Sequence, residues 1–195
     1  MSNSLILVPA RYGSSRFPGK PLAKINNKTM IEYVIKNCED SGLDYSVVTD
    51  NDEIENFLNN LKKNVVRVDD DVTTGSERIF LAYKRYFADK NYQQIINVQG
   101  DEPLLRGNLI KEISNQHLGS NFDIFTAVKK RMTSDTEFLN SNVVKCIYSE
   151  KSKKCFYFSR ASIPFDVAAD KSSFWLQHIG LYSYLPDALE SFVSF

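Results

Sequence analysis

Short, fully apolar runs alternate with longer amphipathic segments through the first two thirds of this chain. Residues 5–8 are apolar at every position, as in a strand that is buried on both faces. Residues 29–41 place apolar side chains at helical spacing and are followed by Gly42, a frequent helix terminator. The alternation then continues with strands expected at 45–49, 65–68 and 95–98 and helices expected around 54–61, at 74–88 and at 107–118. This order predicts an α/β fold with a doubly wound, mostly parallel sheet.

The rhythm changes after about residue 133. Short strands are expected at 143–148 and 155–158 around a polar turn, and residues 177–184 alternate again. We therefore expect an α/β core at 1–132 and a smaller hairpin-rich lobe at 133–195. The last eight residues carry large apolar side chains with no cap or polar tail, so we expect the chain to be cut short within an element.

Charge and cysteine usage exclude several classes of protein. The 195 residues contain 24 Lys+Arg and 24 Asp+Glu, so no long-range field draws the molecule to nucleic acid or to an anionic membrane. The apolar runs fall far short of the roughly 20 residues of a membrane span, and no basic signal-peptide region begins the chain. Cys38, Cys146 and Cys155 form no metal-binding pattern, and we expect buried, reduced thiols. These features predict a soluble, cytoplasmic protein.

The loop at 9–21 follows the first strand, where open α/β sheets bind their ligands. It holds three cations, two glycines and two serines, which suits a polyphosphate because backbone N–H groups and hydroxyls donate while cations neutralise charge. It is not a Walker A loop, because five residues separate Gly13 from Gly19 and proline follows Lys20. A solvated basic turn is the alternative interpretation.

Two further segments lie where the same edge of the sheet is expected. Asp101 follows the strand at 95–98, and its carboxylate can hold a hard cation that bridges phosphate oxygens, with magnesium the natural candidate. A plain turn is the alternative there. Thr74 and Glu77 have capping-box spacing, and the helix that they open can also present Ser76 and Arg78 to an anion or a nucleobase.

The expected second lobe contributes weaker signals. Taken alone, Arg160 is typical of a surface ion pair and His178 of a satisfied, partly buried histidine. If the first lobe binds a nucleotide, then Arg160, His178 and Tyr182 suit a polyhydroxylated acid, with the guanidinium pairing the carboxylate.

Five motifs together resemble the 3-deoxy-manno-octulosonate cytidylyltransferases, the CMP-Kdo synthetases, in order and spacing; they lie at 8–22, 74–78, 97–103, 157–164 and 178–182. The resemblance implies a nucleotide-diphospho-sugar transferase-like fold. It also implies in-line attack of the anomeric hydroxyl of Kdo on the α-phosphorus of CTP, giving CMP-Kdo and pyrophosphate for lipopolysaccharide synthesis, with Mg²⁺ as cofactor.

The resemblance also implies the roles of individual residues. Arg11, Lys20 and Asp101 would be the catalytic residues, the first two holding the triphosphate with Ser14 nearby and Asp101 ligating Mg²⁺. The cytidine would be framed by Ala10, Arg11, Ser76 and Arg78, and the sugar acid would be contacted by Gln99, Arg160, His178 and Tyr182. No side chain in this set is an obvious general base, so we expect catalysis by positioning and charge neutralisation.

Family members typically continue beyond the position of Phe195, with a second metal-binding Asp and a Leu-rich helix used in dimer contact. The sequence is therefore compatible with an active enzyme, which would be a homodimer if that region is present, or with a truncated, catalytically impaired nucleotide-binding remnant. A cytidylyltransferase for a related sugar acid, such as an amino-Kdo, is the third possibility.

Overall fold

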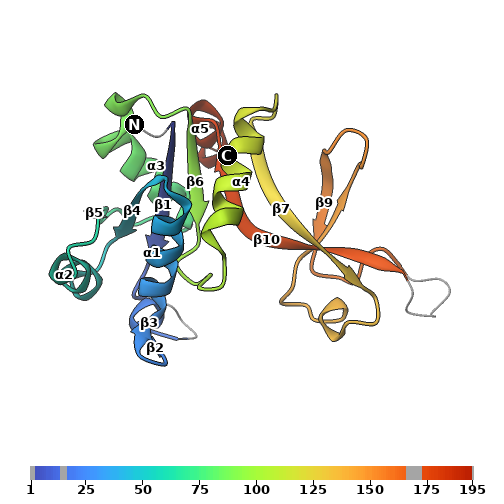
Figure 1. Cartoon of the computed structure of the whole chain (residues 1–195), viewed down its shortest axis with the longest axis horizontal. Coiled ribbons are helices and arrows are strands. Elements are labelled where there is room, and N and C mark those ends of the chain that lie inside the picture. The colour runs from blue at the N-terminus through green and yellow to red at the C-terminus, as the bar shows by residue number, and fades with distance from the viewer. Residues whose placement is uncertain (1–2, 14–16, 166–172, 195) are drawn as a thin grey trace. The chain divides into compact units, whose positions relative to one another are not determined.

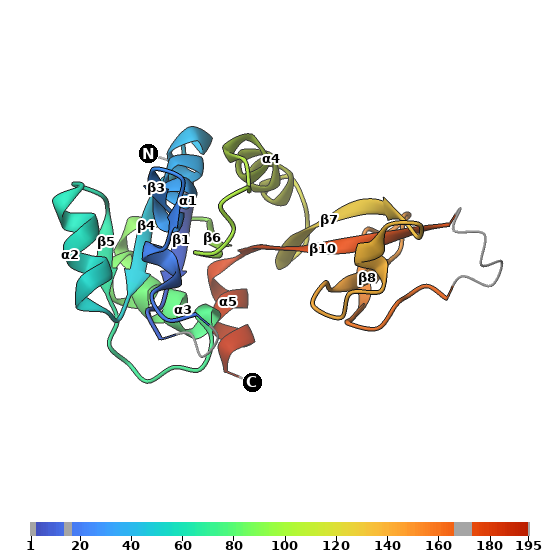
Figure 2. The same ribbon diagram turned by 90° about the horizontal axis from the view of Figure 1, so that it is seen from below.

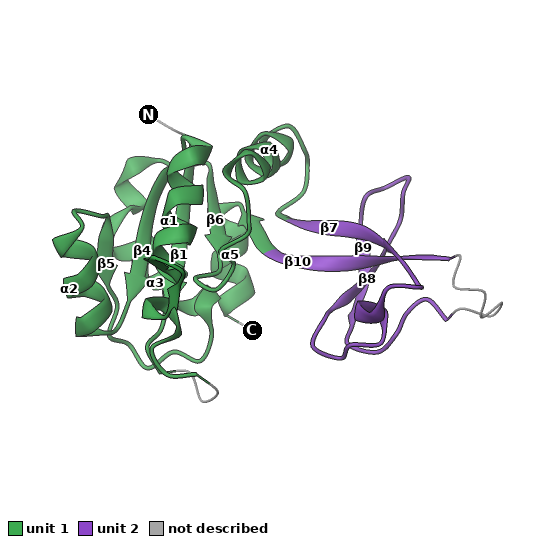
Figure 3. Cartoon of the chain, turned by 60° about the horizontal axis from the view of Figure 1, so that its bottom comes forward, with its two compact units in different colours: residues 1–125, 181–195 green, residues 126–180 purple. Residues whose placement is uncertain are grey.

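The structure, a computed structural model, describes residues 3–13, 17–165 and 173–194. Its contacts divide the chain into two compact units (Figure 3). Unit 1 consists of Met1–Phe125 and Leu181–Phe195, and unit 2 consists of Thr126–Gly180. The expected division at residues 132 and 133 differs from these units, because the C-terminal residues rejoin the first unit.

The sheet of unit 1 has the parallel strand order β5, β4, β1, β6 (Figure 1). Its strands are β1 (Ser4–Ala10), β4 (Asp44–Thr49), β5 (Val65–Arg67) and β6 (Gln94–Val98). The C-terminal part of β10 (Phe174–Tyr184) adds to β6 in antiparallel register, with Leu181 opposite Val98. A small hairpin of β2 (Lys24–Ile25) and β3 (Lys28–Thr29) precedes the first helix.

Helices cover both faces of this sheet, as Figure 2 shows: α1 and α4 lie on one side, and α3 and α5 on the other. The helices are α1 (Met30–Ser41), α2 (Asp52–Asn60), α3 (Gly75–Tyr86), α4 (Gly107–Leu118) and α5 (Pro186–Val193), with short 3₁₀ turns η1 (Lys20–Leu22) and η2 (Ala88–Lys90). Thr74 with Glu77 forms the predicted capping box at α3, and Thr29 with Glu32 forms a second one at α1. The doubly wound, mostly parallel α/β fold is confirmed.

The apolar core of unit 1 explains why the C-terminal segment belongs to it. Leu7 of β1, Ile79 of α3 and Ile95 of β6 form one buried cluster with Tyr184 and with Leu189 of α5. Complete burial of a side chain such as Leu189 contributes about 2 kcal/mol to folding. The residues near the end of the chain, for which an element cut short was expected, form the amphipathic helix α5, with Leu189 on its buried face.

Unit 2 is built from β7 (Ile124–Met132), η3 (Thr136–Phe138), β8 (Lys145–Tyr148), β9 (Cys155–Ser159) and the first part of β10. β8 pairs antiparallel with β9, and Lys145 lies opposite Gln177 of β10. The buried Lys145 ammonium donates hydrogen bonds to the backbone carbonyls of Asn140, Val143 and Arg160. Burial lowers the pKa of Lys145, and its acceptors are neutral carbonyls. The hairpin-rich character expected from sequence is present here.

Three expectations about single residues have different outcomes. Cys38 and Cys146 are buried as predicted, but the prediction for Cys155 was wrong, because this thiol is exposed on β9. Phe192, one of the large apolar side chains near the end of the chain, is 49% exposed, and Phe195 lies outside the described residues. In the described part of the chain, no helix has both the length and the apolar character that crossing a membrane requires.

Gly107, the first residue of α4, generates a stability prediction. A Cβ atom there would lie 2.5 Å from the carbonyl oxygen of Asn37 and 2.7 Å from the amide nitrogen of Ser41, both in α1. Because these are backbone atoms, Gly107→Ala forces the two helices apart and lowers the free energy of unfolding by about 1–3 kcal/mol. Gly119→Ala, just after the same helix, is the matched control, since its nearest contact is an ordinary 3.5 Å. Urea denaturation of both variants measures the difference; equal midpoints would contradict the prediction.

Candidate functional site

A cavity of about 500 Å³ opens at the carboxyl ends of β1 and β6 in unit 1. Among the described residues it is lined by Pro9, Arg11, Phe17, Lys20, Pro21, Gly75, Gln99, Gly100 and Asp101. Four of the residues selected from the sequence therefore share one cavity: Arg11, Lys20, Gln99 and Asp101. The loop after the first strand and the loop after β6 converge as the topology of an open α/β sheet requires.

Lys20 and Asp101 meet across this cavity. The Lys20 Nζ atom lies 2.7 Å from Asp101 Oδ2, and the two side chains are 35% and 51% exposed. Lys20 is held in place because its loop closes on itself: the amide of Gly19 donates to the Tyr12 carbonyl at 2.9 Å, with φ +70° at Gly19, a backbone conformation that favours glycine. An exposed ion pair of this kind contributes little to stability, so both groups can exchange partners when a ligand enters.

Backbone packing around Pro9 sets the spacing of the cavity walls. A Cβ atom on Gly100 would lie 2.8 Å from the Pro9 carbonyl oxygen, and one on Gly75 would lie 3.1 Å from Pro9 Cγ. Only a residue without a side chain lets the loop after β6 approach the end of β1 this closely, and a side chain at Gly75 would push against the Pro9 ring. The distance between the basic loop and Asp101 therefore depends on Gly75 and Gly100, two residues that offer no side chain to a ligand.

Arg78 of α3 is not among the described residues that line this cavity; it is buried, with a side chain only 2% exposed. Its guanidinium pairs with the Asp50 carboxylate at 2.8 Å and donates to the Val68 carbonyl, while Nε has no hydrogen-bond partner among the described residues. Burial lowers the pKa of Arg78; the Asp50 charge opposes this, and the nearby Arg11 cation adds to it. The Arg11 guanidinium in turn donates to the Val72 carbonyl.

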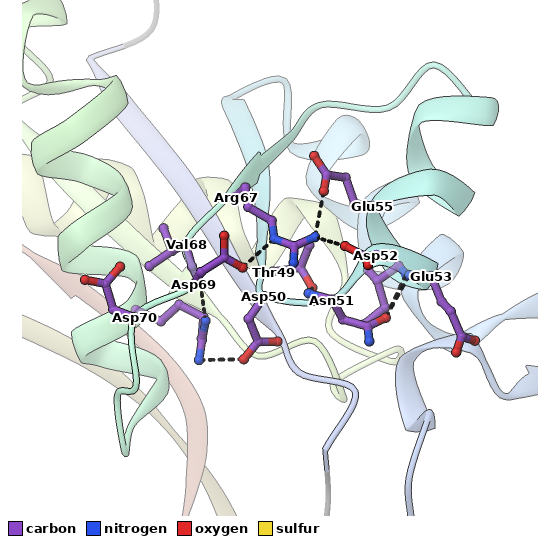
Figure 4. Close-up of polar contacts among 12 residues, drawn as sticks. Thr49, Asp50, Asn51, Asp52, Glu53, Glu55, Arg67, Val68, Asp69 and Asp70 are labelled. Atoms are coloured by element: carbon purple, nitrogen blue, oxygen red, sulfur yellow. Dashed lines mark hydrogen bonds and ion pairs between the residues drawn. The ribbon is translucent and has the colours of Figure 1, made fainter.

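The ends of β4 and β5 carry many carboxylates, and Figure 4 shows how they are divided. Arg67 pairs with Asp52, Glu55 and Asp69, at 2.5, 2.9 and 2.6 Å. Asp50 is not among these partners and is directed to Arg78 instead. Asp50 directly follows β4, at the carboxyl-end edge of the sheet where open α/β folds bind ligands, and it was not among the residues predicted for the site. A carboxylate directly after a buried strand was the signal that could have found it.

The other residues predicted to bind the nucleotide lie near the carboxyl-end edge of the sheet, which we call the rim. Ala10 is the buried last residue of β1, and Ser76 lies in the first turn of α3 beside Gly75. Burial raises the pKa of Tyr184 to about 12, against the opposing effect of a hydrogen bond with Ser76. Ser14 lies outside the described residues.

The four residues expected at the sugar acid come from both units. In unit 1, Gln99 lines the cavity and donates to Asn97 Oδ1 at 3.1 Å, and Tyr182 lies opposite Asn97 in the β6–β10 register. Burial raises the pKa of Tyr182. In unit 2, His178 Nε2 lies 3.0 Å from Thr126 Oγ1, and burial lowers the pKa of this histidine. That all four meet at one ligand stays a prediction.

Arg160, also in unit 2, lies just after β9 and is exposed. Its guanidinium donates to the backbone carbonyls of Ser141 and Asn142, at 3.1 and 3.3 Å. No ion pair is found for it within residues 3–13, 17–165 and 173–194, so the alternative interpretation, a surface salt bridge, receives no support there. A guanidinium held by neutral carbonyls keeps its charge available for a carboxylate.

The single accessible carboxylate at the rim, Asp101, fits a metal ion that takes most of its other ligands from substrate phosphates and water. Asp101 is accessible, and no group of three or more His, Cys, Asp or Glu that could hold a metal is found in the part of the chain that the structure describes. Mg²⁺ usually takes one or two protein carboxylates and completes its octahedron with water and substrate phosphates. Asp101 is exposed, whereas the adjacent Glu102 is half-buried; burial and the Asp101 charge raise the pKa of Glu102.

Comparison with known proteins identifies the family of this chain. The cytidylyltransferase family model matches residues 5–194. A 3-deoxy-manno-octulosonate cytidylyltransferase of Thermodesulfovibrio yellowstonii is 33% identical over 97% of this chain and 78% of its own length, and one of Cytophaga hutchinsonii is 38% identical over 94% and 74%. The chain belongs to the 3-deoxy-manno-octulosonate cytidylyltransferase family.

Solved structures agree with this family assignment. CMP:2-keto-3-deoxy-manno-octonic acid synthetase complexed with CTP superposes with a TM-score of 0.88 at 28% identity, covering 99% of this chain and 78% of that chain. A cytidylyltransferase of Leptospira borgpetersenii, 16% identical with a TM-score of 0.57, shares the fold. The family and the nucleotide-diphospho-sugar transferase-like fold predicted from the five motifs are thus confirmed.

The Asp50–Arg78 pair yields the prediction for this site. Asp50→Asn leaves a buried guanidinium without its counter-ion, and we expect it to lower the free energy of unfolding by about 2 kcal/mol. The matched control is Glu190→Gln, which removes one partner of the exposed Lys84–Glu190 pair and changes stability by less than about 0.5 kcal/mol. Thermal and urea denaturation measure both. If Asp50→Asn is as mild as the control, the buried pair does not stabilise this edge of the sheet.

Proposed function

We propose that this chain transfers the cytidylyl group of CTP to Kdo, giving CMP-Kdo and pyrophosphate for lipopolysaccharide synthesis in the cytoplasm. The observation that carries the proposal is the 2.7 Å contact between Lys20 and Asp101 at the mouth of the rim cavity. A cation for phosphate and a carboxylate for a metal meet there within one cavity, and a nucleoside triphosphate with its divalent metal requires both. The family assignment supports the choice of nucleotide and sugar acid.

The proposed mechanism uses the chain's residues mainly for binding and orientation. Lys20 and Arg11 face the cavity and neutralise the triphosphate, while Arg78, Ser76 and the backbone at Ala10 hold the cytidine. The anomeric oxygen of Kdo forms a bond to the α-phosphorus as the bond to the β-phosphate oxygen breaks, and pyrophosphate leaves. The hydroxyl proton is released, and we assign no residue as its acceptor. Positioning and charge neutralisation suffice for most of the rate enhancement in such transfers.

Asp101 would hold Mg²⁺, completed by phosphate oxygens and water. When bound, this ion would supply charge neutralisation on the triphosphate and help to align it for in-line attack. Lys20 would then leave its contact with Asp101 and turn to the phosphates. Because the pair is half exposed, this exchange of partners costs little.

We expect Asp101→Asn to lower turnover by on the order of 100-fold or more, because a preorganised charge at the reacting phosphate is lost, while thermal stability changes little. Pyrophosphate release with saturating CTP, Kdo and MgCl₂ measures turnover. Asp89→Asn, an exposed aspartate of η2 near the amino end of β4, is the matched control and should keep full activity. An Asp101→Asn enzyme that retains magnesium-dependent turnover would rule out the metal assignment.

The same assay separates the alternatives. Stabilisation of the wild-type chain by CTP without any pyrophosphate release above the enzyme-free control would indicate a nucleotide-binding remnant. Faster turnover with an amino-Kdo than with Kdo would indicate the related sugar acid.

For the sugar acid, we expect Arg160→Gln to raise the KM for Kdo about tenfold or more with the KM for CTP unchanged, because a charge-assisted hydrogen bond to the carboxylate is lost. Lys154→Gln, an exposed lysine at the base of the β8–β9 turn, is the control with the same loss of charge. Steady-state kinetics with each substrate varied in turn distinguishes the two constants. An equal rise in both would mean that Arg160 acts through the fold of unit 2.

A further inference from the structure

Two of the three cysteines lie in contact in unit 2, outside the nucleotide cavity. Cys146 of β8 and Cys155 of β9 have their Sγ atoms 3.6 Å apart. The contact is diagonal: Cys146 lies opposite Phe158, Cys155 lies opposite Tyr148, and a register shift falls between Ile147 and Tyr148. The two thiols therefore come from neighbouring antiparallel strands of one hairpin.

The two thiols differ in their access to solvent. Cys146 is only 1% exposed, whereas Cys155 is exposed on β9, the last strand in the sheet order and thus an edge (Figure 1). A soluble oxidant can reach Cys155 and not Cys146. Burial raises the pKa of Cys146 to about 12, with a further rise from its hydrogen bond to Cys155. Cys146 is thus protected from direct oxidation but lies close enough to react with an oxidised Cys155.

We propose that Cys155 and Cys146 form a peroxide-reactive pair that closes to an intramolecular disulfide. The Cys155 sulfur attacks hydrogen peroxide, forms an S–O bond and releases one water, giving a sulfenic acid. The Cys146 sulfur then attacks Cys155, an S–S bond forms as the S–O bond breaks, and a second water leaves with the thiol proton. The two thiols are oxidised by two electrons in total, and the peroxide is reduced to two waters.

The pair lies next to residues that we assign to the sugar acid. Phe158, opposite Cys146, packs edge-on against the His178 ring at a centroid distance of 5.0 Å, and Arg160 begins the segment after β9. The modification itself does not depend on the proposed function, and its test requires no activity measurement.

The test treats the folded wild-type protein with hydrogen peroxide under native conditions. We expect the number of titratable thiols after unfolding to fall from three to one, with Cys38 retained, and peptide mapping to find Cys146 joined to Cys155 with the loss of two hydrogen atoms. Dithiothreitol should restore all three thiols. Because deprotonation of Cys146 assists its attack, disulfide formation should accelerate as the pH rises.

The matched variant is Cys155→Ser, an exposed replacement that leaves the core intact. We expect it to keep both remaining thiols under the same treatment. Cys146→Ser should stop the reaction at a Cys155 sulfenic acid that a dimedone probe traps. Wild-type protein in which Cys155 advances to sulfinic or sulfonic acid, or links two chains, while Cys146 stays reduced would overturn the proposal.

Discussion

The parallel pairing of β1 with β6 is the constraint on which the rest of the structure depends. Residues Leu5 to Leu7 lie opposite Ile95 to Asn97, so both strands end at the same edge of the sheet. The loops that leave those ends carry Lys20 and Asp101, which are 81 residues apart in the chain and in contact in the fold. Buried apolar side chains on both faces fix this strand pairing. Lys20 and Asp101 are close together because their loops leave the paired strands at the same edge.

In the ligand-free chain, several rim cations already have an oxygen partner. Lys20 has Asp101, Arg78 has Asp50 and the Val68 carbonyl, and Arg11 has the Val72 carbonyl. The pairs differ in accessibility: the Lys20–Asp101 pair is open to solvent, whereas the Arg78 guanidinium is buried. The first is suited to exchange partners with a triphosphate and a metal. The second is suited to hold its shape while a base binds beside it.

Much of this arrangement could be predicted from sequence because its signals are local. The helix at 107–118 follows from its periodicity, and the capping box of Thr74 and Glu77 from its spacing. Other features arise from packing over long distances. β7 has a mixed pattern and was missed, and β10 serves both units although its sequence reads as one strand. The exposure of Cys155 follows from the edge position of β9, which no local pattern encodes. Asp50 directly follows a buried strand, but its partner Arg78 lies in another element, and no local pattern joins the two.

The packing of Gly75 and Gly100 against Pro9 determines which substitutions the cavity can tolerate. Because the end of β1 touches both Gly75 and Gly100 through main-chain or ring atoms, the cavity walls are spaced by covalent geometry rather than by adjustable rotamers. Substitution of the surrounding surface side chains would alter the affinity for a ligand while leaving the spacing of the cavity walls unchanged. A single added methyl at Gly100, which itself carries no charge, would widen it. The glycines are therefore the positions at which a chemically silent substitution is expected to be functionally severe.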